Sequence, residues 1–299
     1  MTRDDQMRFQ AVLTVGAMSL TLLGCDTDAP VIEEAPAPAD VAPPVTSGLA
    51  AAAHFMATWN TRDPDVWAGS LNFPHTRPAA GGHRVWQTKE DYVATTDYAG
   101  VIATGWDHTE FEDLRLVHET DTKAHVAGRW LRVDTDGNPI RRNLVTYIAT
   151  QIDDRWRIKA RFGAGAPLPD DTTQPIADIA TATVESYLTA FNARDPVEWA
   201  AMLNYPHLRI AGGDLRVWET EDDYARWMDF DGFAERTGWD RSVLDEVEVV
   251  QAAENGANVA VTFTRFTADD EIIATFDSLY LITNENGRWG VRARSSFAR

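Results

Sequence analysis

The chain has 299 residues, of which 44% are hydrophobic, a composition typical of globular domains. It carries 46 Asp and Glu residues against 27 Lys and Arg residues, for a formal net charge of −19. This charge repels the phosphate groups of nucleic acids, and no basic run interleaved with aromatic residues offsets it, so we exclude nucleic-acid binding. At this length two domains are expected.

The N-terminal residues have the pattern of a secretion signal. An apolar stretch at residues 11–23 follows two arginines; it is shorter than the roughly 20 residues of a membrane-spanning helix but fits a signal-peptide core. It ends in Leu22-Leu23-Gly24-Cys25, which resembles the bacterial lipobox, where the signal is cleaved before a cysteine that is then acylated. We therefore predict that lipidated Cys25 anchors the chain in the bacterial cell envelope, on the periplasmic side or at the cell surface.

Two alternatives remain open for this segment: a free thiol at Cys25 after an ordinary signal, and a start at Met7 instead of Met1. Residues 25–45 are rich in Pro, Ala and acidic residues and contain few large apolar groups, so they cannot form a core. We expect them to be a disordered tether that holds the domains away from the membrane.

The remaining chain contains one pattern twice. Leu-Asn-Phe-Pro-His at 71–75 returns as Leu-Asn-Tyr-Pro-His at 203–207, and Arg-Asp-Pro at 62–64 returns at 194–196. This spacing far exceeds the roughly 20–50 residues of solenoid repeats, so each copy is expected to be a whole domain. The predicted segments are a signal at 1–24, a tether at 25–45, a first domain at 46–165, a linker at 166–174 and a second domain at 175–299.

Three helices are predicted in each copy. Apolar residues recur at helical spacing over 49–59 and 176–191 and predict the first helix. The Asp-Pro pair starts a second, short helix, because Asp is a good N-cap and Pro is tolerated at the first helical position. Thr88 and Asp91 have capping-box spacing and start the third helix, as does the matching pair in the second copy.

A β-hairpin and four further strands complete each copy. Gly81-Gly82 and Gly212-Gly213 predict the hairpin turns, between the second and third helices. Turn signals such as Asp-Gly-Asn at 136–138 separate the later strands, which we expect to pair antiparallel. The predicted strands lie at 75–77, 84–86, 111–118, 124–133, 142–152 and 155–162 in the first copy, and at 207–210, 216–218, 245–251, 257–266, 272–283 and 288–295 in the second.

This order predicts an α+β fold, with two tandem cone-like domains, each of three helices packed on a curved antiparallel sheet. The element order, the Asn-x-Arg-Asp-Pro junction and the terminal Trp-x-(Ile/Val)-x-Ala-Arg strand resemble the SnoaL-like branch of the nuclear transport factor two-like superfamily. The resemblance implies an apolar pocket in each domain. It also implies pairing through the sheets, so we expect the two domains to pack as an internal pseudo-dimer.

The same resemblance identifies catalytic candidates. In ketosteroid isomerase-like members a tyrosine near the end of the first helix helps to form an oxyanion hole, and an aspartate acts as the base. Tyr187 lies at the tyrosine position of the second copy, whereas the first copy has Phe55 there. Ala79 and Ala211 fall where the base is expected, so neither copy has the complete isomerase set.

The repeated histidines, His75 and His207, are the other catalytic candidates, because histidine is the natural general acid or base near neutral pH. Strand alternation places His207 and Arg209 on the face opposite Leu208 and Ile210. Since the latter two resemble core residues, we expect His207 to face outward or toward a partner domain. A structural histidine bonded to the backbone is the alternative.

Several repeated aromatic and arginine residues are candidates for contact with a ligand, because binding pockets are mostly apolar with a few polar groups. Packing in the core and local salt bridges are the alternatives. The arginine pairs Arg84 with Arg216 and Arg161 with Arg294 are suited to holding a carboxylate. The predicted ligand-binding residues are Trp86, Trp218, Trp106, Trp239, Tyr147, Tyr280, Arg216 and Arg294.

These patterns favour a lipid-anchored binding or accessory protein for a small apolar molecule. There is no phosphate-binding loop, nucleophile elbow or zinc-ligand spacing, so we expect no cofactor and no metal. The alternative is an isomerase or dehydratase acting on a small hydrophobic substrate, with its site in the second domain. There His207 would be the acid or base, and Tyr187 and Trp218 would orient the substrate.

Overall fold

The computed structural model describes residues 45–298, apart from the side chain of Asp171. The predicted signal, Cys25 and almost all of the predicted tether lie outside these residues. Among the described helices, none has both the length and the apolar character needed to cross a membrane. Residues 44–299 form one compact unit that contains both repeats.

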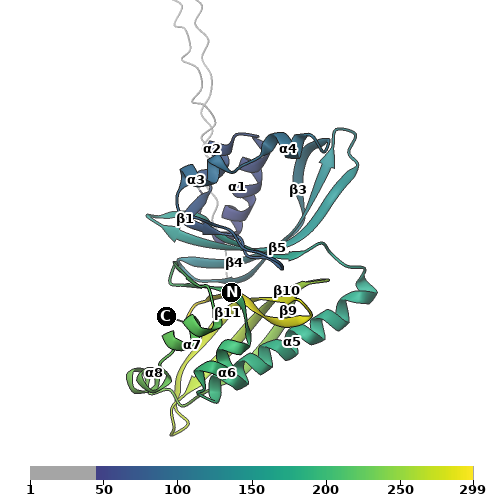
Figure 1. Ribbon diagram of the computed structural model, residues 1–299. Helices are drawn as coiled ribbons and strands as arrows, with labels where there is room; N and C mark the ends of the chain where they lie inside the picture. The colour runs from purple at the N-terminus through teal and green to yellow at the C-terminus, as the bar shows by residue number, and fades with distance from the viewer. Residues whose placement is uncertain (1–44, 299) are drawn as a thin grey trace, which may run out of the picture. The chain divides into compact units, whose positions relative to one another are not determined.

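Each repeat contains four helices and six strands in the same order (Figure 1). The first repeat consists of α1 (Gly48–Asn60), α2 (Pro64–Ala68), β1 (Leu71–Thr76), β2 (Val85–Trp86), α3 (Lys89–Ala94), α4 (Tyr98–Ile102), β3 (Trp106–Glu119), β4 (Lys123–Asp134), β5 (Pro139–Ile152) and β6 (Arg155–Gly165). The second consists of α5 (Asp170–Asn192), α6 (Pro196–Ala201), β7 (Leu203–Ala211), β8 (Asp214–Trp218), α7 (Glu221–Trp227), α8 (Phe230–Thr237), β9 (Arg241–Ala253), β10 (Gly256–Phe266), β11 (Ile272–Glu285) and β12 (Arg288–Ser296).

Local capping determines where the short helices begin. Asp63 accepts two backbone N–H hydrogen bonds at the start of α2, with Pro64 at the first position. Thr88 and Asp91 form both hydrogen bonds of a capping box at α3. A fourth helix, α4, was not predicted; Asp97 caps it by accepting the N–H of Gly100. The prediction of three helices per domain therefore missed one short helix in each copy.

The predicted linker at 166–174 also differs from the structure, because α5 already begins at Asp170. The apolar pattern at 176–191 identified only the part of this helix that packs on the sheet. The first turns are mostly exposed and carry no such periodicity, so sequence periodicity could not detect them.

The sheets have the strand orders β2-β1-β6-β5-β4-β3 and β8-β7-β12-β11-β10-β9. Four of the five neighbouring pairs in each sheet are antiparallel, as predicted, but β1 pairs parallel with β6 and β7 pairs parallel with β12. Each sheet is therefore mixed. A parallel pair needs a long crossover, and here two helices and four strands separate β1 from β6 along the chain.

The helices of each repeat cover one face of its sheet, and the two sheets pack against each other through their other faces (Figure 1). The apolar residues at this inter-repeat interface are Ile148, Ala160, Phe162, Leu208, Ile210, Leu279, Leu281 and Ala293. Polar contacts cross it as well: the buried Lys123 donates to the carbonyls of Ile210 and Ser296 at 3.2 and 2.9 Å, and Gln251 Nε2 donates to the carbonyl of Gly128. The repeats therefore form the expected internal pseudo-dimer.

Candidate functional site

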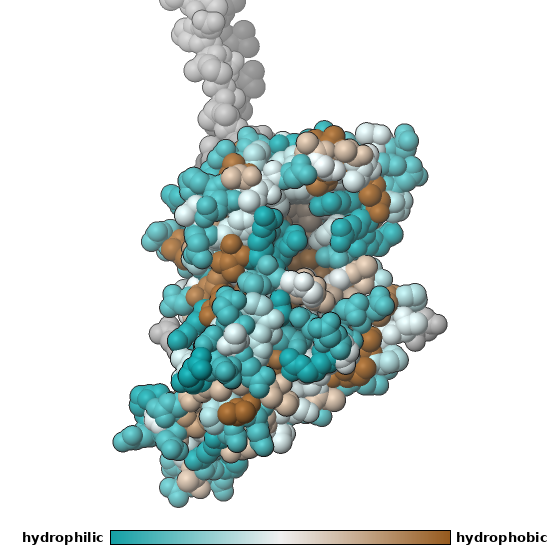
Figure 2. Space-filling view, in the orientation of Figure 1, coloured by the Kyte–Doolittle hydropathy of each residue, from teal (hydrophilic) through white to brown (hydrophobic). Residues whose placement is uncertain are grey.

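The first repeat forms most of an open cavity of about 640 Å³ between its helices and its sheet, and residues 253–255 of the second repeat also line it. Figure 2 shows the surface of this repeat hollowed at that place. The volume lies within the roughly 300–1,000 Å³ usual for ligand pockets. Aromatic side chains from the helices and strands line it: Phe55, Trp59, Trp67, Trp86, Tyr92, Trp130 and Tyr147.

Arg161, on β6, lies at the wall of the cavity and is only 9% exposed. Its Nε donates to His75 Nε2 at 3.1 Å, and its Nη2 donates to the hydroxyl of Tyr92 at 3.0 Å. The guanidinium also lies 5.2 Å from the centre of the Phe55 ring. Within residues 45–298, the remaining nitrogen, Nη1, makes no hydrogen bond, so it is the one available to a bound molecule.

His75 holds Arg161 in place and does not itself line the cavity. The ring is completely buried, and its Nδ1 lies 3.2 Å from the carbonyl of Ile158. A neutral ring that donates from Nδ1 and accepts at Nε2 satisfies both contacts. Burial, and then the charge of Arg161, lower the pKa of His75 well below its ordinary value, so the ring is neutral near pH 7. This geometry supports the structural alternative for His75.

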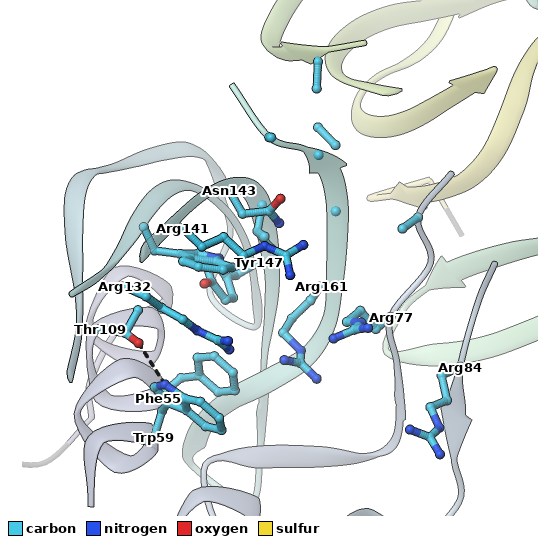
Figure 3. A pocket seen from close by; sticks show the side chains of 18 of the residues that line it. Phe55, Trp59, Arg77, Arg84, Thr109, Arg132, Arg141, Asn143, Tyr147 and Arg161 are labelled. Carbon is cyan, nitrogen blue, oxygen red and sulfur yellow. Dashed lines mark hydrogen bonds between the residues drawn. The ribbon is translucent and has the colours of Figure 1, made fainter. Parts of the chain in front are cut away.

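Five arginines line the cavity: Arg77, Arg84, Arg132, Arg141 and Arg161. In Figure 3, Arg132 and Arg161 extend to the same space on either side of Phe55, and Arg77 lies beside Arg161. None of the five is paired with a carboxylate in the described part of the chain. Repulsion by Arg161, and then burial, lower the pKa of Arg77 to about 10, still well above neutral pH.

In the second repeat, larger side chains occupy the positions that match this cavity. Strand register aligns Arg132–Arg141 with Arg265–Ala274, and it likewise aligns Trp130–Asn143 with Phe263–Phe276. Four residues that line the first cavity have a larger, aromatic residue at the matching position of the second repeat, and these aromatic residues pack in or against the second core. The four pairs are Phe55 with Tyr187, Thr95 with Trp227, Val101 with Phe233, and Asn143 with Phe276.

Tyr187 and Arg294 meet in this filled core. Arg294 donates from Nη1 to the hydroxyl of Tyr187 and from Nη2 to the hydroxyl of Tyr224, at 2.6 Å in the latter case. Burial raises the pKa of Tyr187, so its hydroxyl keeps its proton. Tyr187 therefore satisfies an arginine and does not face an open pocket.

The face predicted for His207 is wrong. His207 is completely buried against Trp218 and Tyr224, on the helix side of β7, and its Nδ1 lies 3.0 Å from the carbonyl of Val291. Leu208 and Ile210 face the other sheet. Because both faces of β7 are buried, apolar side chains do not distinguish the helix side from the inter-repeat side. Burial, and then Arg294, lower the pKa of His207 well below its ordinary value.

A site in the second domain was expected, but the aromatic-lined cavity lies in the first repeat. A space of about 650 Å³ in the second repeat is lined by residues of α5 and α6 and their ends and has no aromatic wall. Of the predicted ligand-binding residues, Trp86 and Tyr147 line the cavity of the first repeat. Trp106 instead donates from Nε1 to Thr109 in the core. The others belong to the second repeat: Trp218, Trp239 and Tyr280 in its core, Arg216 stacked on Trp218 and Trp227, and Arg294 bonded to two tyrosines.

Sequence reasoning missed most of the cavity wall, including Trp59, Trp67, Trp130, Arg77, Arg132 and Arg141. A comparison of the residues at matching positions of the two repeats would have shown that the first repeat has the smaller side chains and is therefore the one with space for a cavity. Across residues 45–298, no group of three or more His, Cys, Asp and Glu side chains is arranged to hold a metal ion. The acidic residues at the cavity are Asp97, which caps α4, and Glu254, from the turn between β9 and β10.

Comparison with known proteins agrees with the repeated fold. The family described as "NTF2-like protein (DUF6841)" matches residues 51–163 and again 177–296. None of the curated proteins matches the chain. Solved structures similar to it include a ketosteroid isomerase-like protein from Erwinia carotovora atroseptica (23% identity, 39% of this chain and 91% of that one, TM-score 0.30). An NTF2-like protein from Novosphingobium aromaticivorans is another (8% identity, 42% and 82%, TM-score 0.36).

Proposed function

Since the chain belongs to the NTF2-like family DUF6841 through both of its repeats, we propose that the first repeat binds a small, largely apolar molecule. The observation that carries this proposal is the open, aromatic-lined cavity of the first repeat beside the filled one of the second. The second repeat then serves as a closed partner domain, whose sheet buries the outer face of the binding domain.

Binding fits this cavity better than catalysis does. A general base must lie within hydrogen-bond reach of the proton it removes. His75 is held behind Arg161, and Asp97 accepts the backbone N–H of Gly100. Ala79, at the position where related isomerases carry the base, lines the cavity with a methyl group. Glu254 is exposed at the end of a turn.

The neutral probe N-phenyl-1-naphthylamine, which fluoresces when it enters an apolar site, tests the proposal. Both cores and their interface lie within residues 44–299, so this part of the chain is suited to the titration without lipid or detergent. We expect saturable binding with one site per chain. Trp59, Trp67 and Trp130 line the cavity, so their fluorescence should be quenched with the same dissociation constant.

A filled-cavity variant is the matched control. Val101→Phe with Asn143→Phe introduces the aromatic residues that the second repeat has at these positions, Phe233 and Phe276. We expect probe binding to fall by at least about tenfold while the unfolding temperature is maintained or raised, because an apolar void is filled. Undiminished binding by a folded double variant would contradict the assignment of the site.

For the location of the protein, we propose anchoring through lipidated Cys25. The supporting feature is Leu22-Leu23-Gly24-Cys25 at the end of the apolar segment. Expression of the full chain in bacteria with labelled palmitate should label the wild type and leave Cys25→Ala unlabelled and released from the membrane fraction. Equal labelling of both chains, or none in either, would rule out this anchor.

A further inference from the structure

We infer that the molecule bound in the first repeat carries an oxyanion, a carboxylate or a sulfonate, on an aromatic or otherwise apolar body, and that the cavity arginines hold it. The inference rests on the proposed function and specifies the ligand class of the same site. It comes from a comparison of how the two repeats use their arginines. Four of the five cavity arginines have an arginine counterpart in the second repeat, and Arg141 alone is replaced, by Ala274.

In the second repeat, the chain itself supplies partners to three of these arginines. Arg294 bonds to two tyrosine hydroxyls, as described above. Arg265 lies 5.0 Å from the ring centres of both Phe233 and Phe276. Arg216 lies 4.9 Å from Trp227 as well as from Trp218. Hydroxyl acceptors and aromatic faces both stabilise a guanidinium that has lost part of its hydration.

In the first repeat, the residues that provided those partners are changed. Phe55 lacks the hydroxyl of Tyr187, which leaves Arg161 Nη1 without an acceptor among the described residues. Val101 and Asn143 replace two rings that cover Arg265, so Arg132 keeps contacts only with the rings of Trp59 and Trp130 among the described residues, at 5.3 and 5.2 Å. Thr95 replaces Trp227, so Arg84 keeps only the contact with Trp86, at 5.3 Å.

The substitutions therefore open the space and expose the positive charge together. Smaller side chains alone would give an apolar pocket, but the four changed positions face three different arginines. Arg141 adds a further charge that the second repeat lacks. Like charges gathered without a carboxylate partner repel one another in the empty site. A ligand oxyanion relieves that repulsion, and the planar fork of arginine suits it by donating paired hydrogen bonds.

The chain has a net charge of −19, so carboxylates are plentiful, yet none of those described pairs with the five cavity arginines. Other arginines of the first repeat are paired with acids: Arg62 with Asp107, and Arg129 and Arg142 with Glu112. Arg142 is the direct chain neighbour of Arg141, is exposed like it, and does not line the cavity. It therefore provides a control with the same change of charge.

Two probes of nearly the same shape test the inference on residues 44–299: 1-anilinonaphthalene-8-sulfonate and the neutral N-phenyl-1-naphthylamine. We expect the sulfonate to bind about tenfold more tightly or better, and its dissociation constant, unlike that of the neutral probe, to rise with NaCl. Arg141→Ala should weaken the sulfonate about five- to tenfold and change the neutral probe less than about twofold. Arg142→Ala should change neither by more than about twofold.

The outcomes separate the two proposals. Equal affinity for the probes, with no difference between Arg141→Ala and Arg142→Ala, would overturn the anionic ligand and leave the apolar binding site intact. Binding of the neutral probe alone would do the same. Binding of neither probe by the folded wild type would overturn the proposed function and the inference together.

Discussion

Arg294 donates a hydrogen bond to the hydroxyl of Tyr187 in the core of the second repeat, and this contact marks the difference between the two copies. At the matching place in the first repeat, Arg161 lies against the ring of Phe55, which has no hydroxyl. At this position, one oxygen atom distinguishes an arginine whose Nη1 has an acceptor within its own chain from one whose Nη1 has none among the described residues and which lines a cavity.

Phe55→Tyr should give Arg161 the hydroxyl acceptor that Arg294 has in the second repeat. The new hydroxyl would lie where it can accept from Arg161 Nη1, as Tyr187 does from Arg294, and would compete with a ligand oxyanion. We expect the affinity for 1-anilinonaphthalene-8-sulfonate to fall about three- to tenfold, as measured by fluorescence titration. Phe73→Tyr, which copies Tyr205 and lies outside the cavity wall, is the control and should have no effect.

Tyr187→Phe should destabilise the second repeat. The change removes one acceptor from a guanidinium whose Nε is already buried without a partner. We expect the free energy of unfolding, measured with urea, to fall by about 1–3 kcal/mol. Binding of the neutral probe at the first repeat should be unchanged under native conditions, because Tyr187 lies outside that cavity. A variant as stable as the wild type would show that Tyr187 does not support Arg294.

Lys123 should make the stability of the inter-repeat interface depend on pH. Burial, and then the charge of Arg209, lower its pKa from 10.5 to about 7. Between these values the unfolded chain binds the proton more tightly than the folded one. The contribution of Lys123 to the free energy of unfolding should therefore increase as pH rises from about 7 to 10.5, by at most about 1.4 kcal/mol per pH unit.

Urea unfolding of the wild type and Lys123→Met at pH 6, 7.5 and 9 measures this contribution, because the other titrating groups are shared. The stability of Lys123→Met relative to the wild type should be highest at pH 6 and decrease toward pH 9. A difference between the two chains that stays constant over this range would contradict the lowered pKa.

A protein of residues 44–299 should be a monomer in solution. The sheet faces that superfamily members commonly use for pairing already pack against each other within one chain, through residues such as Phe162 and Leu279. Light scattering coupled to size exclusion should give the mass of one chain at micromolar concentrations. A stable dimer or higher oligomer would show that another surface mediates association.

Much of the fold could be predicted because it depends on contacts between residues close in sequence. The N-caps at Asp63 and Thr88 involve groups two or three positions apart, and the later strands follow from turns and periodicity. The mixed sheet could not be predicted in this way. The pairing of β1 with β6 joins residues far apart in the chain, and nothing in either strand alone records it.

The sequence by itself determined two copies of one α+β domain, since a repeat of this length and its caps and turns are local, countable features. Only the tertiary structure decided which copy is open and which face of β7 meets the helices. Phe55, Thr95, Val101 and Asn143 come from three helices or their ends and one strand, and they become a cavity only when the fold brings them together. Their effect on the arginines depends on distances in space, which sequence spacing does not contain.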